Sequence, residues 1–328
     1  MPSPIVTIFG GSGFIGRYVA RRMARAGWRV RVAVRRPNEA LFVRTYGVVG
    51  QVEPVQANIR DEDSVRRAVA GATAVVNCVG IMVENGKQQF DAVQDEGAGR
   101  VARLAAAAGA TRLVHVSAIG ADAGGDSLYA RSKAAGEAAV LAAFPGAVIL
   151  RPSIVFGVDD AFFNRFGRMA RISPVIPLVS PGTRFQPVYV DDVAAAAEAA
   201  ARGDAAPGVY ELGGPDVASF RALIERLLDI VRRRRLIVTV PAGLAALQGS
   251  ALDFAQRISF GAFVNEMLTR DQVRLLAHDN VVAPGAKGLA DLGVAPTAMA
   301  AVLESYLYAY RPGGQYAAIK DSAAQLRS

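Results

Sequence analysis

The hydrophobic pattern of the first half of the chain alternates between short apolar runs and longer segments with helical spacing. Residues 5–9 are almost wholly apolar, as in a strand buried on both faces of a sheet. Over residues 14–26 apolar side chains recur every three or four positions, and Gly27 follows the last of them. This spacing is typical of an amphipathic helix and its end. The first predicted elements are therefore a strand and a helix.

The same alternation continues to about residue 120. Apolar runs typical of strands lie at 28–34, 52–59, 74–80 and 112–120. Helical patterns lie between them, at 61–71 and in a long stretch that ends near Gly109. Alternation of this kind predicts an α/β fold, specifically a Rossmann-type doubly wound parallel sheet with helices on both faces.

The pattern changes in the second half of the chain. From about Arg151 the alternation becomes irregular and proline becomes commoner. A chain of 328 residues is long enough for one main domain and a smaller second lobe. We expect the main domain at residues 1–150 and a smaller C-terminal α/β lobe at residues 151–328. This lobe is expected to be interleaved with the end of the sheet and to contact a partner or a substrate.

A glycine-rich turn, "GGSGFIG", joins the first strand to the first helix at residues 10–16. In such a turn Gly10 permits the tight bend, Gly13 lets the backbone approach a pyrophosphate, and Gly16 lets helix and strand pack closely. The amides and the dipole at the helix N-terminus then favour phosphate charge. Because this pattern follows a strand and opens a helix, it predicts dinucleotide binding in preference to a plain structural turn.

The end of the second strand, "VAVRRP", bears on which dinucleotide is bound. A carboxylate there hydrogen-bonds the ribose 2′-hydroxyl of NAD and repels a 2′-phosphate. No Asp or Glu lies between Gly16 and Glu39, and Arg35 and Arg36 offer fork-shaped donors suited to a phosphate. The alternative is that both are solvated surface arginines. We predict that they select NADP(H), which makes residues 1–150 an NADP-binding domain.

Two further strand ends belong to the same predicted site. In "ANIRD", Asn58 and Ile59 end the third strand, where a side chain can sandwich an adenine. In "NCVG", Cys78, Val79 and Gly80 end the fourth strand and place small residues near the cofactor. No histidine is close to Cys78 in the sequence, so we interpret it as a small buried hydrophobe and not as a nucleophile.

The segment "YARSK" places Tyr129 and Lys133 four residues apart, and therefore on one helical face. An ammonium group beside a phenol lowers the pKa of the phenol, and the lysine can hold the nicotinamide ribose. The four lysines of the chain are Lys87, Lys133, Lys287 and Lys320, and the other 33 of its 37 Lys and Arg residues are arginines. Since arginine stands at nearly every other basic position, a lysine at 133 indicates that its point charge is required and favours this interpretation over coincidence.

Composition limits the remaining classes of partner. A formal net charge of +8 favours anionic partners such as nucleotide phosphates, acidic proteins or lipid headgroups. With one cysteine and two histidines we expect no disulfide and no metal site, and we expect no nucleic-acid partner. The first strand begins so close to Met1 that we expect no signal peptide. The apolar stretch at 236–249 contains Pro241 and is too short to span a bilayer.

Several motifs together resemble the extended or atypical short-chain dehydrogenase/reductase superfamily over about residues 4–215. They are "GGSGFIG", "NIRD", "NCVG", the Tyr-x-x-x-Lys pair, "LRPSIVFG" and "FQPVYVDDVA", in this order and spacing. The resemblance implies NAD(P) binding, a functional Tyr–Lys pair and a substrate lobe on the C-terminal side. Beside the residues already named, it implies these nucleotide-binding positions: Ser12, Phe14, Ile15, Ser117, Pro152 and Ile154.

The sequence departs from the superfamily after the fifth strand. Members of the superfamily carry a Ser or Thr there that hydrogen-bonds the substrate oxygen beside the tyrosine. Here the strand ends "HVSAIG", so that Ser117 is followed by Ala118 and Ile119 where the catalytic hydroxyl normally lies. Strand alternation is expected to turn Ser117 elsewhere. We therefore assign no catalytic residue and regard Tyr129, Lys133 and Ser117 as vestigial candidates.

Two stretches near the C-terminus narrow the resemblance. "LTRDQVRLLAHDNVV" (268–282) predicts a helix with a capping box at Thr269 and Gln272. "LGVAPTAMAAVLESYLYAYRPGGQY" (292–316) carries Leu303, Leu307 and Tyr310 on one helical stripe. Both resemble the short-chain-dehydrogenase-like accessory subunits of respiratory complex I, of the alpha-subcomplex subunit nine type, and their bacterial relatives.

This resemblance implies that NADPH is held tightly without turnover. It also implies other complex I subunits as partners and a docking position on the peripheral arm, near the membrane and the quinone site. For a bacterial protein, that position is peripheral on the cytoplasmic side of the inner membrane. We therefore interpret the chain as a complex I accessory subunit with a structural nucleotide.

Two other function classes stay open at this stage. Intact Tyr129 and Lys133 favour an active NADP-dependent reductase, epimerase or dehydratase, and a third possibility is a redox-sensing regulator that reads the NADPH/NADP ratio. The run Arg232 to Arg235 is either a lipid or partner contact or a solvated helix end. The stretch 244–263 is either a docking surface or core. Asp191 and Asp192 in "YVDDVA" are expected to cap the following helix, not to bind a metal.

Overall fold

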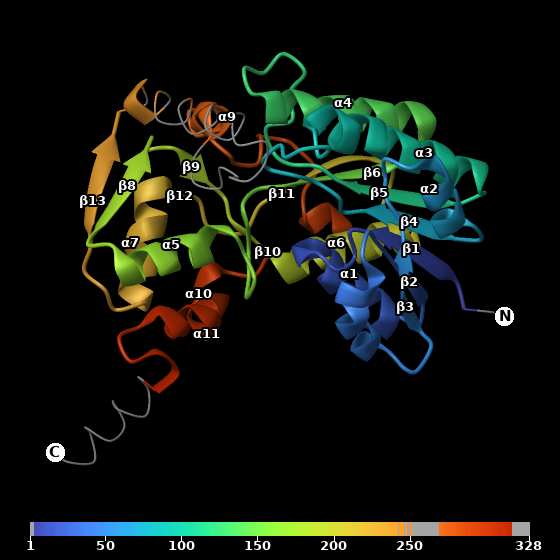
Figure 1. The fold of residues 1–328 in the computed structure, drawn as a ribbon, viewed down its shortest axis with the longest axis horizontal. Helices are drawn as coiled ribbons and strands as arrows, with labels where there is room; N and C mark the ends of the chain where they lie inside the picture. Colours follow the sequence, from blue (N-terminus) through green and yellow to red (C-terminus); the bar gives the residue numbers. More distant parts are fainter. Residues whose placement is uncertain (1–2, 242, 246, 248–249, 251–268, 317–328) are drawn as a thin grey trace.

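The computed structural model describes residues 3–241, 243–245, 247, 250 and 269–316. These residues form a large sheet with helices on both faces and a second lobe beside it (Figure 1). The N-terminus lies at the end of the sheet that is remote from the second lobe (Figure 1). The strands therefore run toward the second lobe and end next to it.

The central sheet has seven parallel strands in the order β11-β6-β5-β4-β1-β2-β3. The strands are β1 (Ile5–Phe9), β2 (Arg29–Val34), β3 (Val52–Gln56), β4 (Ala74–Asn77), β5 (Arg112–Val116), β6 (Val148–Pro152) and β11 (Gly208–Leu212). The chain order reverses between β1 and β4, which is where open α/β sheets bind their ligands. This topology confirms the predicted Rossmann-type sheet.

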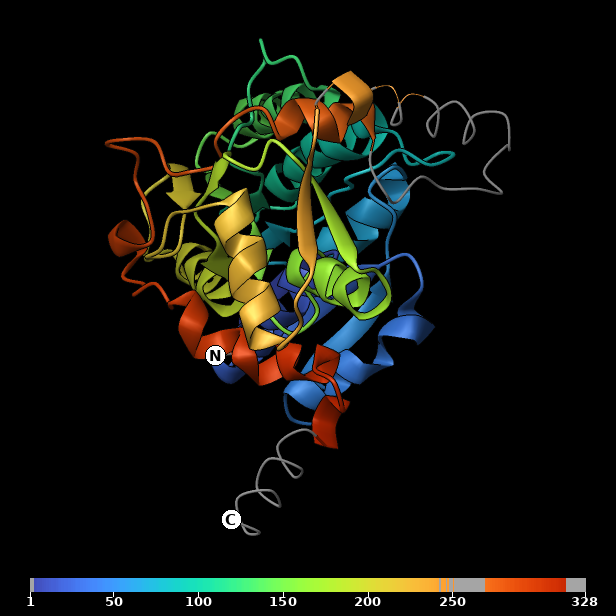
Figure 2. The same cartoon turned by 90° about the vertical axis from the view of Figure 1, so that its left-hand side faces the viewer.

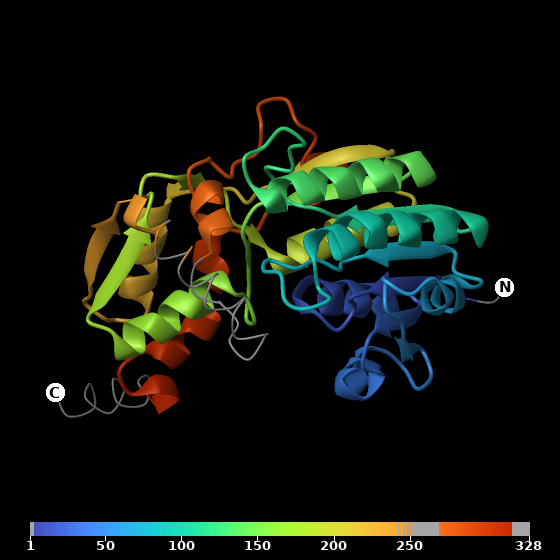
Figure 3. The ribbon, with the colours of Figure 1, turned by 45° about the horizontal axis from the view of Figure 1, so that its top comes forward.

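Helices cover both faces of the sheet, as Figures 1 and 3 show. One face carries α1 (Phe14–Arg25) and α6 (Val190–Arg202), which pack on Val6 and Ile8 of β1. The other face carries α2 (Glu62–Val69), α3 (Glu96–Ala107) and α4 (Leu128–Ala143). Both faces are covered, so the strands must be apolar on both sides, and this explains the unbroken apolar runs in the sequence.

Two less regular segments link some of these elements. After β2 the chain forms the 3₁₀ segment η1 (Pro37–Tyr46). Before α3 it forms one π-helical turn, η2 (Asp91–Asp95). Single π-turns at the start of an α-helix are frequent at functional sites.

The second lobe is built on a parallel two-stranded ribbon of β8 (Val175–Val179) and β13 (Leu236–Val240). Figure 2 views this lobe end-on and shows the ribbon flanked by α5 (Phe162–Ile172) and α7 (Phe220–Ile230). Its core is rich in phenylalanine, including Phe156, Phe163, Phe166 and Phe220. Two short strand pairs connect the lobe to the sheet: β7 (Val155–Phe156) with β10 (Val188–Tyr189), and β9 (Arg184–Phe185) with β12 (Ala218–Ser219).

The C-terminal motifs form short helices and not the long ones suggested by their spacing. The predicted capping box is confirmed at the start of α9 (Arg270–Leu275), which ends well before residue 282. The second motif divides into α10 (Met299–Val302), α11 (Glu304–Leu307) and the 3₁₀ turns η4 (Tyr308–Tyr310) and η5 (Gly314–Tyr316), after η3 (Ala290–Leu292). Its predicted stripe packs into the second-lobe core, where Leu303 and Leu307 are fully buried.

The prediction that Asp191 and Asp192 cap a helix is wrong. The N-cap of α6 is Tyr189, and no side chain caps this helix. Asp191 instead pairs with Arg22 of α1 at 2.7 Å. Asp192 accepts hydrogen bonds from the backbone amide of Thr297 at 2.6 Å and from its hydroxyl at 2.9 Å. Both carboxylates hold distant segments against α6, which local spacing does not reveal.

Three expectations concern the chain as a whole. Across the ranges given above, no helix combines the length and the apolar character that a membrane span needs. In those same ranges, no group of three or more His, Cys, Asp or Glu side chains is placed to hold a metal ion. Most of the stretch 244–263 lies outside the described residues.

Candidate nucleotide-binding site

The turn between β1 and α1 has a backbone that requires glycine. Gly10 has a φ of +72°, in the left-handed region that favours glycine. Its amide donates to the carbonyl of Ala33 at 3.0 Å, and its carbonyl accepts from the amide of Gly13 at 2.9 Å. A Cβ on Gly16 would lie only 2.3 Å from the carbonyl oxygen of Gly10. Any side chain at Gly16 therefore forces α1 away from the turn.

The N-terminus of α1 is open to an anion. Its N-cap is Gly13, which has no side chain to cap the helix, and the first turn begins with Phe14 and Ile15 and contains no acidic residue. The first amides of a helix have no partner within the helix, and the helix dipole favours negative charge beside them. The turn and the helix end together form a phosphate cradle.

Arg17 fixes this cradle from the side and was not predicted as a site residue. Its guanidinium donates to the carbonyl groups of Ser12 and Gly13, both at 3.3 Å. It also pairs with Asp159 of the second lobe at 2.8 Å. Helical spacing places Arg17 among solvent-facing arginines of α1, and only the folded chain shows that it folds back over the turn.

The arginines after β2 have different surroundings. Arg36 is exposed and pairs with Glu39 at 3.0 Å. Arg35 lies beside Arg60, the third residue of "NIRD". In the amide orientation that satisfies its neighbours, the Oε1 atom of Gln88 accepts from Arg35 at 3.1 Å and from Arg60 at 3.2 Å. Two guanidinium groups thus converge on one oxygen atom, an arrangement that also suits a phosphate oxygen. Sequence reasoning missed Arg60.

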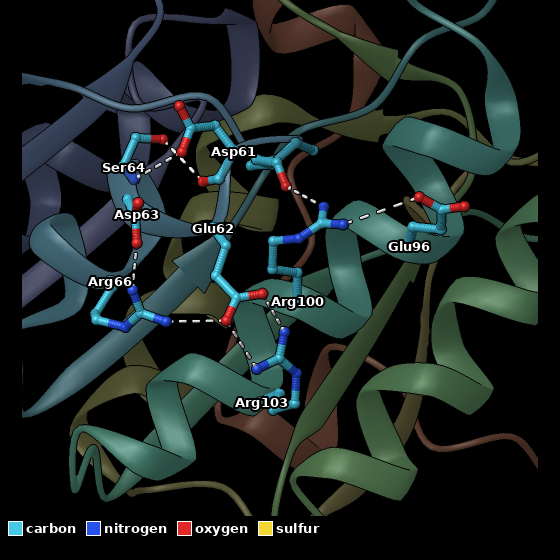
Figure 4. Close-up of polar contacts among 9 residues, drawn as sticks. Asp61, Glu62, Asp63, Ser64, Arg66, Glu96, Arg100 and Arg103 are labelled. Atoms are coloured by element: carbon cyan, nitrogen blue, oxygen red, sulfur yellow. Dashed lines mark hydrogen bonds and ion pairs between the residues drawn. The ribbon is translucent and has the colours of Figure 1, made fainter.

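The loop after β3 is held rigidly from α2 and α3. Asn58 donates its amide to Ser64 at 2.9 Å, and Ser64 donates its hydroxyl to the Asn58 carbonyl at 3.0 Å. Arg100 of α3 donates to the carbonyl of Ile59 at 2.7 Å (Figure 4). The Ile59 side chain is buried, and a Cβ on Gly97 would lie 2.7 Å from it. These contacts fix the backbone that presents Arg60.

A charged cluster beside this loop joins α2 to α3. Figure 4 shows Glu62 between Arg66 of its own helix, at 2.9 Å, and Arg103 of α3, at 2.8 Å. Asp61 caps α2 by accepting from the Ser64 amide at 3.1 Å. Exposed ion pairs contribute little singly, so the cap and the Arg100 bond carry most of the local order.

The end of β4 lies against the glycine turn. A Cβ on Gly10 would lie 3.2 Å from Val79 and 3.3 Å from the backbone of Cys78. The amide of Val79 donates to the Asn77 side chain at 3.1 Å, which shapes the turn toward Gly80. Burial raises the pKa of the Cys78 thiol to about 12, so the thiol stays protonated. A protonated thiol matches its interpretation as a small hydrophobe and not as a nucleophile.

Tyr129 and Lys133 meet on α4, but their electrostatics differ from the prediction. The Nζ atom of Lys133 lies 5.7 Å from the centroid of the Tyr129 ring, over its face. Burial raises the pKa of Tyr129 to about 12, and burial lowers the pKa of Lys133 to about 8. The prediction that Lys133 lowers the pKa of the phenol is therefore wrong, because burial raises that pKa.

His115 and Asn77 form a buried pair across β4 and β5. Nδ2 of Asn77 lies 3.2 Å from Nδ1 of His115. Since the amide nitrogen can only donate, Nδ1 accepts, and the hydrogen of the neutral ring lies on Nε2. Burial, with the charge of Lys133 second, lowers the pKa of His115 to about 3. The ring is therefore a neutral donor near neutral pH.

Five buried side-chain polar atoms have no hydrogen-bond partner among the described residues, and three of them belong to this part of the site: Nε2 of His115, Oγ of Ser117 and Oε1 of Gln94. Buried polar atoms in proteins are nearly always paired. A Cβ on Gly80 would lie 3.1 Å from Nζ of Lys133 and 3.9 Å from Oε1 of Gln94, so this end of the site is crowded with polar groups. A polar ligand with hydroxyl and amide groups, such as a nicotinamide riboside, matches this set of donors and acceptors.

The strand ends around Ser117 are close-packed. Ser117 is 4% exposed, and its amide donates to the Leu150 carbonyl at 2.7 Å. Ile119 is also buried and donates its amide to the carbonyl of Pro152 at 3.0 Å. Ile154, which follows β6, packs against the core of the second lobe and not against the sheet. Ser117 thus lies inside the fold, while Ala118 and Ile119 offer no hydroxyl.

The residues present fit a nicotinamide nucleotide. The glycine cradle would hold the pyrophosphate, Arg35 and Arg60 the adenosine end, and Lys133 with the unpaired polar atoms the nicotinamide end. Such a nucleotide, when bound, supplies a hydride donor or acceptor. At neutral pH the raised pKa keeps the proton on the hydroxyl of Tyr129.

Comparison with known proteins places the chain in a family. It matches the NAD dependent epimerase/dehydratase family over residues 6–213. It is 34% identical over 316 residues to "NADH dehydrogenase [ubiquinone] 1 alpha subcomplex subunit 9, mitochondrial" of Arabidopsis thaliana. This alignment covers 94% of this chain and 79% of that protein. It is 37% identical over 191 residues to ceramide reductase of Caulobacter vibrioides. This shorter alignment covers 58% of this chain and 59% of that protein.

A solved structure has the same fold. The NADPH-dependent quinone oxidoreductase of Escherichia coli, complexed with NADPH, superposes with a TM-score of 0.70 at 17% identity. The superposition covers 92% of this chain and 98% of that one. The family match supports a nicotinamide nucleotide as the cofactor class, and the predicted resemblance is confirmed. The chain belongs to the NAD dependent epimerase/dehydratase family and, within it, to the family of the alpha subcomplex subunit 9 of NADH dehydrogenase.

Proposed function

We propose that the chain is an accessory subunit of respiratory complex I in which tightly held NADPH has a structural role. Relatives that are named as subunits of NADH dehydrogenase or of NADH-ubiquinone oxidoreductase match 89% to 96% of this chain. The proposed partners are therefore the other subunits of that complex. Residues 1–150 are proposed to hold the nucleotide, and residues 151–328 to supply most of the partner surface.

The proposal that this nucleotide is not turned over is based on one observation, the side chains of the segment that follows β5. Neither Ala118 nor Ile119 offers a hydrogen-bond donor to a substrate oxygen, and Ser117 is buried. A substrate carbonyl beside Tyr129 would therefore lack the Ser or Thr hydroxyl that members of the superfamily place next to the tyrosine. General acid catalysis depends on a substrate held in place as well as on a proton donor. A site with a full nucleotide cradle and an incomplete catalytic set favours a structural nucleotide.

NADPH is proposed over NADH because of Arg35 and Arg60. Both guanidinium groups reach one oxygen of Gln88, and no carboxylate follows β2 before Glu39. A phosphate oxygen in that place would accept two charge-assisted hydrogen bonds. Arg36, which pairs with Glu39, is proposed as a weaker contributor.

A tagged copy of the chain, purified from detergent-solubilised membranes of its source, tests this function. It should carry other complex I subunits with it, and mass spectrometry of the nucleotide released on denaturation should find NADP(H). Arg35→Ala combined with Arg60→Ala should weaken NADPH binding by at least about 100-fold, because each charge-assisted bond contributes roughly 1.5 to 3 kcal/mol.

NADH binding should be unchanged in that double variant, because the two arginines are proposed to bind the 2′-phosphate, which NADH lacks. Arg36→Ala is the matched control and should weaken NADPH binding much less. Release of NAD(H) alone would overturn the NADPH assignment, and purification without complex I subunits would overturn the accessory role.

We also propose that the second lobe meets the membrane surface at the edge formed by β13 and the end of α5. Ile172 is 85% exposed and Leu236 is 64% exposed. Burial and the charges of Arg235 and Arg171 lower the pKa of Arg233, so these three arginines gather at the same edge. Exposed apolar side chains beside arginines suit acyl chains and anionic headgroups. This contact would make the chain peripheral, on the cytoplasmic side of a bacterial inner membrane.

Sedimentation of the purified chain with vesicles tests the membrane contact. Vesicles that contain anionic lipid should bind the chain, whereas purely zwitterionic vesicles should bind it weakly. Leu236→Glu should reduce binding to the anionic vesicles, while Leu128→Glu, at an exposed leucine of α4, should not. Equal binding by both variants would contradict this docking edge.

A second candidate function is an active NADP-dependent reductase. The observation in its favour is that Tyr129 and Lys133 remain together on α4, with Nζ over the ring. The partial match to a ceramide reductase points the same way. NADPH oxidation by the pure chain in the presence of long-chain ketones would support this function, and dependence on Tyr129 would assign it to this site.

A further inference from the structure

Residues 269–282, which we call the tail clamp, return to the nicotinamide end of the site from far along the chain. The clamp begins with α9 and continues through Asp279 and Asn280 to Val282. In Figure 1 α9 lies between the second lobe and the region where α4 begins. Its side chains bond to the start of α4 and to the ends of β5 and β6.

Asp271 binds the N-terminus of α4. Its carboxylate accepts from the hydroxyl of Ser127 at 2.8 Å, from the amide of Leu128 at 2.7 Å and from the amide of Tyr129 at 3.0 Å. Ser127, in turn, accepts from the amide of Ala130 at 3.3 Å. The first three amides of α4 are thus paired, two of them by a carboxylate more than 140 residues away in sequence.

This contact bears directly on the Tyr–Lys pair. Tyr129 is the second residue of α4 and is held through its own backbone amide, and Lys133 lies one turn further along the same face. A carboxylate at a helix N-terminus is stabilised by the helix dipole and by charge-assisted bonds to the amides. Without Asp271 the first turn of α4 would lose two of these bonds and would fray at Tyr129.

Asn280 makes the second contact, with the ends of two strands. Its Nδ2 atom donates to the carbonyl of Ile119, which follows β5, at 3.2 Å. Its Oδ1 and backbone oxygen atoms accept from the hydroxyl of Ser153, which follows β6, at 2.6 and 2.9 Å. One side chain therefore ties the segment that departs from the superfamily, Ser117 to Ile119, to the end of β6.

The clamp is itself held in place. The reciprocal capping box of Thr269 and Gln272 closes the start of α9. Arg274 donates to the carbonyl of Asp126, just before α4, at 3.0 Å. Asp279 pairs with Arg184 of the second lobe at 2.7 Å. A short helix of six residues keeps its shape here because contacts from both parts of the molecule fix it.

We propose that the tail clamp positions the nicotinamide half of the site, with Asp271 as the positioning residue for Tyr129 and Lys133. The inference rests on the proposed nucleotide binding and names a second determinant of it. The phosphate cradle and the arginines are formed without the clamp, so the clamp acts on one half of the nucleotide only.

Binding measurements with two ligands test the proposal by calorimetry on the full chain. NADPH spans the whole site, whereas adenosine 2′,5′-bisphosphate reaches only the adenosine end. Asp271→Asn should weaken the binding of NADPH about tenfold, which equals about 1.4 kcal/mol of binding free energy. It should change the affinity for the bisphosphate by less than about twofold. Asp291→Asn is the matched control, since its carboxylate accepts from the backbone amide of Gly288 at 2.7 Å, outside the clamp, and it should change neither affinity.

The wild-type measurement separates the two levels of inference. Failure of the wild-type chain to bind NADPH would overturn the proposed function, irrespective of the clamp. Equal weakening of both ligands by Asp271→Asn, or no weakening of either, would overturn the clamp. If Asp271→Asn does not fold, Ser127→Ala removes one bond to Asp271, and a smaller loss confined to NADPH is then the expected result; no loss, or an equal loss for both ligands, would overturn the clamp.

Discussion

The two ends of the nucleotide site are built in different ways. The phosphate cradle uses backbone atoms of one strand–turn–helix unit, and its shape depends on Gly10 and Gly16. The nicotinamide end uses side chains from separate segments, including Gln94, His115 and Lys133, and is held by a clamp that begins at residue 269. A backbone site tolerates changes elsewhere in the chain, whereas a side-chain site can lose one chemical group at a time.

Under the proposed function, this difference would explain how a member of an enzyme family keeps a nucleotide and loses a reaction. The binding energy for the phosphates would then come from the cradle and the nearby arginines. Catalysis would need a complete set of side chains at the other end, where this chain carries Ala118 and Ile119 in place of a hydroxyl side chain. Substitutions at one end or the other should therefore have different effects. The largest effect on nucleotide binding and stability is expected from a substitution in the cradle.

Gly16→Ala should abolish nucleotide binding and destabilise the fold. Its Cβ would lie 2.3 Å from the carbonyl oxygen of Gly10, so α1 must move away from the turn that forms the cradle. Overpacking of this kind costs about 1 to 3 kcal/mol. A further roughly 2.7 kcal/mol of stabilisation is lost at about 100 times the Kd of the nucleotide. Thermal unfolding with and without NADPH measures both effects.

The control is Gly182→Ala, in the second lobe, where a Cβ would meet nothing within 4 Å. This variant should unfold at nearly the wild-type temperature, and NADPH should raise that temperature as it does in the wild type. A Gly16→Ala chain that NADPH still stabilised would show that the turn is not where the phosphates bind.

At the other end, His115 should make stability depend on pH. Its pKa is about 3 in the folded chain, below its ordinary value of 6.5. Between these values the unfolded chain binds a proton that the folded chain does not, so stability is lost as the pH falls below 6.5. This loss amounts to about 2 kcal/mol between pH 7 and pH 5. His115→Gln should remove it in urea unfolding at the two pH values.

His278, which is exposed, provides the matched variant. His278→Gln should keep the wild-type loss of stability between pH 7 and pH 5. An unchanged pH dependence in His115→Gln would mean that the ring is hydrated in solution, and the buried polar cluster would then need another explanation.

Sequence patterns predicted more of the phosphate end of the site than of the nicotinamide end, and one physical reason accounts for this difference. The alternation of strands and helices, the glycine turn and the capping box at Thr269 follow from neighbouring residues, and the fold and the capping box are confirmed. Long-range contacts leave no local pattern. Arg60, His115 and Asp271 were missed for this reason, because each takes its role from a partner on another element.

The two errors have related causes. The role of Asp191 and Asp192 was assigned from their place at a helix start, but they bond to Arg22 and Thr297 on distant segments. The pKa of Tyr129 was predicted from its spacing to Lys133, but burial dominates it. Spacing shows which side chains are neighbours on a helix, whereas desolvation depends on everything that packs over them.

The smallest effect is expected from Tyr129→Phe, which removes the hydroxyl and keeps the ring that packs edge-on against Phe90 at 6.0 Å. In a working reductase a positioned proton donor contributes about 10² to 10⁴-fold to the rate, so its loss would be plain. In a subunit with a structural nucleotide, complex content and NADH:quinone turnover in membranes should match the wild type, with Gly16→Ala as the impaired comparison. If Tyr129→Phe stayed folded and nucleotide-bound but lost a physiological activity, the nicotinamide end would be catalytic, and the contrast between the two ends would not hold.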